Sequence, residues 1–464
     1  MPAAVKNKIA GFMNSLIELA RDDPRRVIHS LKVGIALSFV SVFYYYQPLY
    51  DDFGVSAMWA VMTVVVVSEF SVGATLGKGL NRGMATLLAG ALGIGAHHVA
   101  NQFGHAGEPF VIGFFVFMLA AVTTFVRFIP GVKARYDYGL LIFILTFSFV
   151  SVSGYRDDEI LDVAQKRVST IMIGASVCVI VSIALFPVWA GEDLHYLIAL
   201  NLEKLGNFLE GITRSISKRN LAQDPERDFA YSARKMDAFT GFGDEYFQDQ
   251  ESKTEDLAST LQDYRSILNS KNTEESLANF ARWEPCHGRF QFRHPWKLYL
   301  QIGTLARQCA YRIEALNRYL TAEIQTPVSV RAKIKEPGTK MSRECGRALK
   351  EMSTAIKAMC QPCASDVHIE ASKAAAKGLN SLLKSGIWEG IDLLQVTPVA
   401  TVASLLIDVV NCTEKIADAV AELASKAEFK RLSDGAPSPE KLVRRGHVAI
   451  TVEESNMNNR ASDE

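Results

Sequence analysis

The strongest constraint on this sequence is a series of long apolar stretches in its first 190 residues. A helix that crosses a bilayer needs about 20 predominantly apolar residues. Because the bilayer core offers the backbone no water, membrane segments of this kind fold as helices. Stretches that approach the required length lie at residues 27–48, 54–75, 79–100, 109–129, 137–153 and 164–188. The pattern predicts a pore or transport domain of six transmembrane helices over residues 27–190.

The second stretch leads into a segment rich in glycine and basic residues. The apolar run led by Trp59 continues past a single acid, Glu69, to a segment that carries Lys78 and Arg82. Because glycine punctuates regular structure, we expect residues 76–82 to form a turn between the second and third spans.

The charges of the connecting segments indicate the orientation. Lysine and arginine, without acids, occupy segments 76–82 and 129–136, whereas aspartate and glutamate dominate segments 47–53 and 155–163. Cytoplasmic loops carry the excess of lysine and arginine. Both termini are therefore predicted to be cytosolic, and the acidic segments are predicted to face outward.

The remaining sequence predicts helical and polar segments outside the membrane. Residues 1–26 form an amphipathic segment that either lies on the membrane surface or packs on the protein. Residues 191–431 follow the amphipathic helical period and predict a cytosolic α-helical domain. Residues 432–464 contain few apolar residues and predict a disordered tail. The predicted fold class is an all-α membrane protein, with six transmembrane helices followed by a cytosolic helical domain.

Composition and motifs point away from enzymes and nucleic-acid binding. The chain holds 50 basic and 50 acidic residues, so no basic excess favours a nucleic-acid partner. The sequence contains no phosphate-binding loop or nucleophile motif, so we expect neither catalysis nor a cofactor. Cys360 and Cys363 have the spacing of a redox or metal pair, but no second pair stands at zinc-site distance.

Several charged residues fall at or near membrane depth. A charge at the bilayer centre costs about 2.5–3.5 kcal/mol, so such residues are tolerated where water, a partner or a mobile ion compensates them. Basic residues outnumber the single acid, which favours an anion pathway, since rings of lysine and arginine select anions. Each residue taken singly could instead be a boundary charge that snorkels or forms an ion pair. The set comprises Lys32, Glu69, Lys78, Arg82, Arg127, Lys166 and Arg167.

Two acidic features accompany these bases. Glu69 is expected to pair with one of the bases and to shape a gate, with a proton-relay role as the alternative. The acids of the outer segments could converge into an oxygen-lined cation site, or they could form a solvated rim. Those outer acids are Asp51, Asp52, Asp158, Glu159 and Asp162.

Taken together, the motifs resemble the plant aluminium-activated malate transporter family of anion channels. The resemblance covers residues 22 to about 430, nearly the whole chain. The motifs that carry it are Asp22-Asp23-Pro24-Arg25-Arg26, Trp59–Val66, Gly73–Gly83, Arg127-Phe128-Ile129-Pro130, Tyr136-Asp137-Tyr138-Gly139, Pro187–His195 and Trp283-Glu284-Pro285.

The resemblance implies a homodimeric, six-span anion channel with a helical cytosolic domain and with malate as the leading permeant anion. We expect the channel to pass malate out of the cell passively, down its electrochemical gradient. It implies that basic residues matching Lys32, Lys78, Arg82, Arg127 and Arg167 line or support the pore. Members that are gated by external aluminium ions carry acids at positions matching Asp51, Asp158 and Asp162, so an aluminium site is expected there. The plasma membrane is the expected location, with the vacuolar membrane as the alternative.

Two other functional classes stay open. A proton-coupled carrier or exporter of organic or aromatic acids would use Glu69 as its coupling carboxylate. A membrane-anchored scaffold would bind partners through its helical half and would carry no current. A reversal potential that follows the anion gradient and not the pH separates a channel from the carrier.

Overall fold

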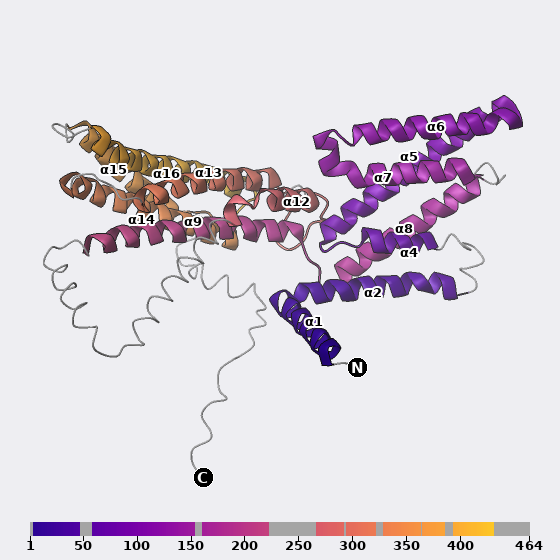
Figure 1. Cartoon of the computed structure of the whole chain (residues 1–464), viewed down its shortest axis with the longest axis horizontal. Coiled ribbons are helices and arrows are strands. Elements are labelled where there is room, and N and C mark those ends of the chain that lie inside the picture. Colours follow the sequence, from indigo (N-terminus) through magenta and orange to yellow (C-terminus); the bar gives the residue numbers. More distant parts are fainter. Residues whose placement is uncertain are drawn as a thin grey trace, which may run out of the picture. The chain divides into compact units, whose positions relative to one another are not determined.

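The computed structural model describes most of the chain as helices in two compact units (Figure 1). The described residues are 3–46, 58–153, 160–221, 266–291, 294–321, 328–362, 364–385 and 393–430. The first unit comprises Met1–Asp193 and Ser276–His294, and the second comprises Leu194–Glu275 and Pro295–Glu464. Among the described residues no β-strand is present, which confirms the all-α class.

The first unit contains the helices of the predicted membrane domain. An amphipathic helix, α1, is followed by α2, and Asp23 separates them by accepting the Arg25 backbone N–H at 3.1 Å. Pro24 occupies the first turn of α2, where its missing N–H leaves no hydrogen bond unmade. The unit consists of α1 (Ala3–Asp22), α2 (Pro24–Tyr45), α4 (Met58–Val67), α5 (Val72–Ala100), the short 3₁₀ helix η2 (Asn101–Phe103), α6 (Gly104–Val126), α7 (Pro130–Ser153) and α8 (Ile160–Ala184).

Length and apolar composition mark five helices among the described residues as candidate membrane spans. Four lie in the first unit and correspond to the predicted third to sixth spans, in α5 with η2, α6, α7 and α8. Helix α2 covers most of the predicted first span, and α4 is a shorter apolar helix within the second. The fifth candidate, Val396–Lys426, lies in the second unit, where half of its most apolar window is buried within the protein.

The prediction of a turn over residues 76–82 is wrong. Helix α4 ends at Val67, and α5 begins at Val72 and runs without interruption through Lys78 and Arg82. The Ser71 side chain caps α5 by accepting the Ala74 backbone N–H at 3.3 Å. The glycines of this region therefore serve close packing inside a helix, and they do not mark a turn. The predicted loop 129–136 is likewise shorter, because α7 already begins at Pro130.

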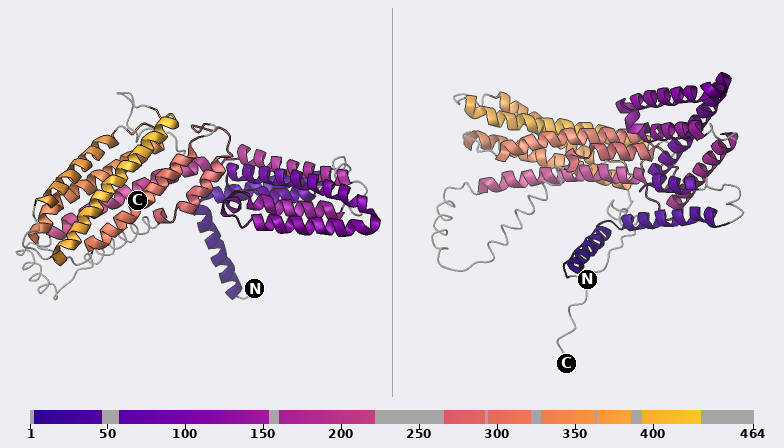
Figure 2. Two further views of the ribbon diagram at one scale, coloured as in Figure 1. Left: turned by 90° about the horizontal axis from the view of Figure 1, so that it is seen from above. Right: turned by 45° about the vertical axis from the view of Figure 1, so that its right-hand side comes forward.

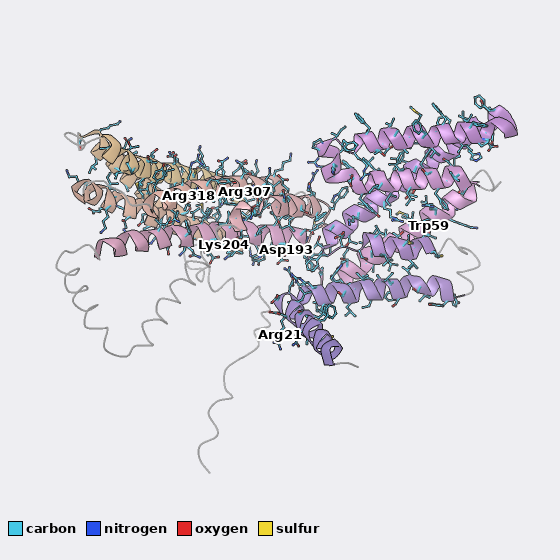
Figure 3. The ribbon with its side chains drawn as sticks, viewed as in Figure 1. Arg21, Trp59, Asp193, Lys204, Arg307 and Arg318 are labelled. Carbon is cyan, nitrogen blue, oxygen red and sulfur yellow. The ribbon has the colours of Figure 1, made fainter. Side chains whose placement is uncertain are left out.

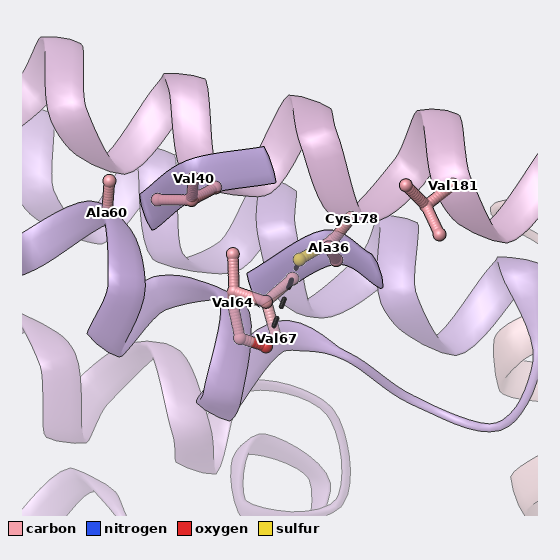
Figure 4. Close-up of a cluster of buried hydrophobic side chains, with 7 residues drawn as sticks. All are labelled: Ala36, Val40, Ala60, Val64, Val67, Cys178 and Val181. Atoms are coloured by element: carbon pink, nitrogen blue, oxygen red, sulfur yellow. Dashed lines mark hydrogen bonds between the residues drawn. The ribbon is translucent and has the colours of Figure 1, made fainter. Parts of the chain in front are cut away.

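A buried apolar cluster joins α2, α4 and α8 (Figure 4). The Cys178 thiol lies in it and donates a weak hydrogen bond to the Val64 carbonyl at 3.8 Å. At Gly174 of α8, a Cβ atom would stand 2.7 Å from the Ala60 carbonyl oxygen, so only glycine permits this approach. The cluster comprises Ala36, Val40, Ala60, Val64, Val67, Cys178 and Val181.

The second unit is a bundle of long amphipathic helices (Figure 2). Helix α13 packs against α16, and α14 packs against both α15 and α16. These helices bury apolar stripes at helical spacing, as the sequence predicted. The helices that form or enter this unit are α9 (Ala190–Leu221), α12 (Lys271–Ala281), α13 (Trp296–Thr321), α14 (Val328–Ala358), α15 (Ser365–Lys384) and α16 (Leu393–Lys426).

One buried carboxylate of the second unit makes several polar contacts. The Glu274 side chain is fully buried and forms an ion pair with Arg307, which is labelled in Figure 3. The Glu274 carboxylate also accepts the Ser270 hydroxyl at 2.7 Å and the Asn201 side-chain amide at 3.3 Å. Its oxygens press against Gly303 of α13, so that an added Cβ atom would stand 2.7 Å from the Glu274 carboxyl carbon.

We expect Gly303→Ala to lower the free energy of unfolding by about 1–3 kcal/mol, because the added methyl group must displace the buried carboxylate. Thermal unfolding of the purified protein measures this change. Gly378→Ala is the matched control, since no atom lies within 4 Å of its Cβ position in α15 and alanine favours a helix. Equal behaviour of the two variants would contradict the close contact at Gly303.

Candidate functional site

Among the described residues of the first unit, the most buried cation is Arg167 on α8. Its side chain is 2% exposed, and its guanidinium lies 3.9 Å from the ring centre of Trp59 and 4.2 Å from that of Phe149. Trp59 is labelled in Figure 3. The Arg167 Nε and Nη1 atoms have no hydrogen-bond partner among the described residues. The two rings satisfy the face of the guanidinium but leave these N–H donors unsatisfied.

A second buried guanidinium, Arg82, lies on α5. Its side chain is 4% exposed, its Nη1 donates to the Tyr138 hydroxyl at 3.1 Å, and its Nε has no partner among the described residues. The charge of Arg82 is close enough to repel that of Arg167. No carboxylate of the described residues pairs with either guanidinium. A buried charge that lacks a partner of opposite charge is costly, so both guanidinium groups are sites where a bound anion would be stabilised.

Buried hydroxyl groups accompany the two arginines. Thr86 follows Arg82 by one turn on the same face of α5, while Thr146 and Ser151 lie on α7, which packs along α5. The side-chain oxygens of all three residues are buried without a hydrogen-bond partner in the described part of the chain. We refer to Arg82, Thr86, Thr146, Ser151 and Arg167 as the polar strip.

The course of α8 places Arg167 beyond Arg82 along the strip. A Cβ atom on Gly79 of α5 would stand 3.5 Å from Ala175, and one on Gly83 would stand 3.3 Å from the sulfur of Met172. Helices α5 and α8 are therefore antiparallel. Because Arg167 lies five residues before Met172, it is displaced along α8 by about 7 Å toward the end of α5 that carries Ala100.

Glu69 pairs with Lys78. This ion pair joins the segment before α5 to the second turn of that helix, and about one third of each side chain is exposed. The Lys78 ammonium also lies 5.7 Å from the ring centre of Tyr138, the residue that accepts the hydrogen bond from Arg82. The pairing expected from the sequence is therefore present, with Lys78 as the partner.

Two other predicted pore residues lie apart from the strip. The Lys32 ammonium donates to the backbone carbonyls of Phe186 at 2.9 Å and Ser182 at 3.5 Å, beside the C-terminal end of α8. A cation is stabilised there by the helix dipole. Arg127 forms an ion pair with Asp137 at 2.8 Å across the connection between α6 and α7. Each of these bases therefore has local partners, unlike Arg167.

The expected aluminium ligands cannot be placed. Asp51 and Asp158 lie outside the described residues, and the side chain of Asp162, in the first turn of α8, is also outside them. Within the described part of the chain, no group of three or more His, Cys, Asp or Glu side chains is placed to hold a metal ion.

A buried carboxylate of the Trp283-Glu284-Pro285 motif contacts two helix starts. Glu284 accepts the backbone N–H groups of Ala190 at 2.6 Å and Gly191 at 3.0 Å, at the start of α9. The Gly73 N–H, at the start of α5, also stabilises this carboxylate. Helix N-termini favour negative charge. Burial nevertheless raises the pKa of Glu284 above its usual value, and the three backbone N–H groups oppose that rise.

The corner around Glu284 is closely packed. His287 stacks on Trp189 with 3.8 Å between ring centres, and a Cβ atom on Gly73 would meet the Phe280 carbonyl oxygen and the Glu284 side chain. The glycines before Lys78 and the Trp-Glu-Pro triplet were both visible in the sequence. Their contact joins segments about 200 residues apart, and neither motif alone predicts it.

Comparison with known proteins gives consistent matches. The family model described as aluminium activated malate transporter matches residues 17–388 and 386–424. Aluminum-activated malate transporter 7 of Arabidopsis thaliana is 54% identical over 416 residues, covering 89% of this chain and 81% of that protein. Aluminum-activated malate transporter 2 of the same plant is 53% identical over 416 residues, covering 89% of this chain and 77% of that protein.

A relative from another plant also matches over most of its length. Aluminum-activated malate transporter 1 of Triticum aestivum is 42% identical over 441 residues, covering 93% of this chain and 89% of that protein. The family comprises transporters and not enzymes, which agrees with the expected class. The helices of the first unit, its buried arginines and these matches lead to one conclusion: the chain is a multi-pass membrane protein that belongs to the aluminium-activated malate transporter family.

Proposed function

We propose that this protein is an anion channel that passes malate across the membrane, and that anions move along the polar strip. The observation that carries the proposal is Arg167, a guanidinium 2% exposed whose Nε and Nη1 have no hydrogen-bond partner among the described residues. A carboxylate is the natural partner for such donors. The names of the relatives supply malate as the anion.

The charge balance along the strip supports anion selectivity. Arg82 and Arg167 contribute positive charge, and the nearby acid Glu69 is already engaged by Lys78. The unpartnered hydroxyls of Thr86 and Thr146 can replace part of the water that a carboxylate loses on entry. A cation would instead meet two guanidinium groups with no free carboxylate beside them among the described residues.

The distribution of charge supports the proposed orientation, and the family resemblance supports the proposed direction and membrane. We propose that both termini are cytosolic, because the basic residues lie at the Arg127 and Lys133 end of the membrane unit. Because the cell interior is electrically negative, malate leaves the cell passively through an open channel. The plasma membrane is the proposed location, and fluorescent fusion protein in plant cells tests it against the vacuolar membrane.

Two-electrode voltage clamp of oocytes loaded with malate tests the proposed function. We expect an inward current, which corresponds to anion efflux, with a reversal potential that follows the malate gradient. Protein present at the cell surface without any such current would contradict the channel and favour a scaffold.

Activation by aluminium ions is proposed for the outer acids. We expect micromolar external aluminium at acid pH to increase the malate current, and Asp158→Asn with Asp162→Asn to abolish the increase while sparing the basal current. Several carboxylates are needed to hold a hard cation. If aluminium leaves the wild-type current unchanged, these acids form a solvated rim only.

A homodimer is proposed on the basis of the family resemblance. Light scattering of the purified protein in detergent, corrected for bound detergent, measures its mass. A mass of one chain would contradict the proposal.

The pairing of Glu69 with Lys78 separates a channel from a proton-coupled carrier. For a channel we expect Glu69→Gln to change the malate current by less than about threefold, since a partly exposed ion pair contributes little energy. The reversal potential should also stay independent of pH. A coupled carrier would lose its pH-dependent uptake in Glu69→Gln, and the wild-type reversal potential would move with pH.

A further inference from the structure

A basic pocket lies in the first unit, where the second turn of α5 meets the start of α7. Its volume is about 440 Å³, and its walls carry the cations Lys78, Lys133, Arg135 and Arg282 against one acid, Asp137. Lys78 pairs with Glu69 and Asp137 pairs with Arg127. The remaining positive charge of Lys133, Arg135 and Arg282 is not offset by any ion pair among the described residues.

An apolar groove continues from this pocket. Its volume is about 640 Å³, and Asn81, Tyr136 and Trp283 line both spaces. The groove runs along the outside of α5, where Met84 is 61% exposed and Leu88 is 57% exposed. Aliphatic side chains of this size at membrane depth contact either lipid or another protein.

Trp283 connects the two spaces and is held in place. A Cβ atom on Gly77 would stand 3.0 Å from the indole ring, so α5 and the indole are in close contact. The indole side chain still remains 41% exposed. Tryptophan and tyrosine are the residues that prefer the boundary between headgroups and acyl chains.

We propose that the pocket and the groove together bind an anionic phospholipid of the cytosolic leaflet. Its phosphate headgroup contacts Lys133, Arg135 and Arg282, and one acyl chain lies along Met84 and Leu88. The charge of the pocket complements a phosphate, and the groove complements a chain that a small dicarboxylate does not possess. The site shares no lining residue with the polar strip and does not depend on whether the strip conducts, while its assignment to the cytosolic leaflet rests on the proposed orientation.

Quenching of Trp283 fluorescence by lipids with brominated acyl chains tests this proposal on the full-length protein. The protein is reconstituted in phosphatidylcholine vesicles that contain brominated phosphatidic acid or, in parallel, brominated phosphatidylcholine. Subtracting the signal of Trp283→Phe isolates this tryptophan from the other four in the chain. We expect brominated phosphatidic acid to quench Trp283 at a mole fraction at least about tenfold lower than brominated phosphatidylcholine, since each basic residue adds about 1 kcal/mol for anionic lipid.

Charge variants identify the headgroup site. Combining Lys133→Gln, Arg135→Gln and Arg282→Gln should remove the preference for phosphatidic acid. The matched control combines Lys271→Gln, Lys297→Gln and Lys377→Gln, which alter exposed lysines of the second unit and should preserve it. Arg167→Gln should also preserve it, so that a failed lipid site and a failed anion pathway give different results.

The other outcomes overturn the proposal. Equal quenching by both brominated lipids would show a generic lipid-facing groove. Protection of Trp283 from both would show that another protein surface, such as a second copy, covers the groove. Loss of the phosphatidic acid preference on adding glycerol 3-phosphate at low concentration would show that the pocket takes soluble phosphates in place of a lipid.

Discussion

Replacing Arg167 with glutamine is expected to reduce the malate current about 10- to 100-fold, because a hydrogen bond between a carboxylate and a charged donor contributes about 1.5–3 kcal/mol. The Nε and Nη1 donors of Arg167 are buried and unpartnered among the described residues, so a passing carboxylate is the group that satisfies them. Voltage clamp in oocytes measures the current, and surface labelling confirms equal amounts of protein at the membrane.

Two further variants define what Arg167 supplies. Arg167→Lys should recover only part of the current, since an ammonium keeps the charge but loses the planar stack between Trp59 and Phe149. Lys166→Gln is the matched control, because it removes the same charge from the neighbouring position on α8, outside the strip. We expect its current to fall less than about threefold. A full wild-type current in Arg167→Gln would exclude this guanidinium from the pathway.

Loss of the Glu284 carboxylate is expected to lower the free energy of unfolding by about 2–6 kcal/mol, because the N–H groups of Ala190 and Gly191 are left buried without an acceptor and each orphaned donor costs about 1–3 kcal/mol. Glu284→Ala is the variant, and thermal unfolding in detergent is the measurement. Because the same carboxylate holds the starts of α5 and α9, the malate current should fall with stability.

Glu284→Gln separates the role of the acceptor from that of the charge. The amide keeps one oxygen but turns an N–H₂ group toward a backbone donor, so we expect about half of the stability loss seen with alanine. Glu275→Ala is the control, because Glu275 is an exposed residue of α12 whose one ion pair among the described residues is a distant contact to Lys271 at 4.0 Å. If Glu284→Ala unfolds at the wild-type temperature, the carboxylate does not hold the two helix starts together.

The sequence predicted the helices that can be identified from their hydropathy alone. The stretches at 109–129, 137–153 and 164–188 correspond to α6, α7 and α8, and the amphipathic period over residues 191–431 predicted a helical region, which includes α13 and α15. The family resemblance was confirmed over most of the chain. Patterns of this kind are properties of a single segment, so they predict a helix without knowledge of the tertiary structure.

The error at residues 76–82 has a specific physical cause. Glycine permits both a turn and a close helix contact, and the sequence does not distinguish them. The structure shows contacts, since Gly73 meets Glu284 and Gly77 meets Trp283. Both partners come from a segment about 200 residues later in the chain, which no local pattern connects to α5.

The contacts of the predicted site residues were likewise predictable from the sequence only in part. The sequence predicted a basic partner for Glu69 from charge and from proximity along the chain. The observed partner, Lys78, lies nine residues away. The packing of the helices decides which bases find partners. It places Arg167 against the rings of Trp59 and Phe149. It also brings Lys32 to the Phe186 carbonyl and Arg127 to Asp137. The sequence therefore identified the set of charges but could not separate the arginines that lack a carboxylate partner among the described residues from the bases that form ion pairs or backbone contacts.

Cysteine accessibility at Thr146 tests the polar strip most directly. Thr146 is 1% exposed and lies on α7, and its hydroxyl has no partner among the described residues. In Thr146→Cys, the negatively charged sulfonatoethyl methanethiosulfonate should block the malate current, the positively charged trimethylammonium reagent should act far more slowly, and excess malate should protect the thiol. Thr63→Cys is the control, since Thr63 is buried and its hydroxyl already donates to the Trp59 carbonyl. A Thr146→Cys channel that resists both reagents, or that reacts faster with the cationic one, would contradict an anion pathway along the strip.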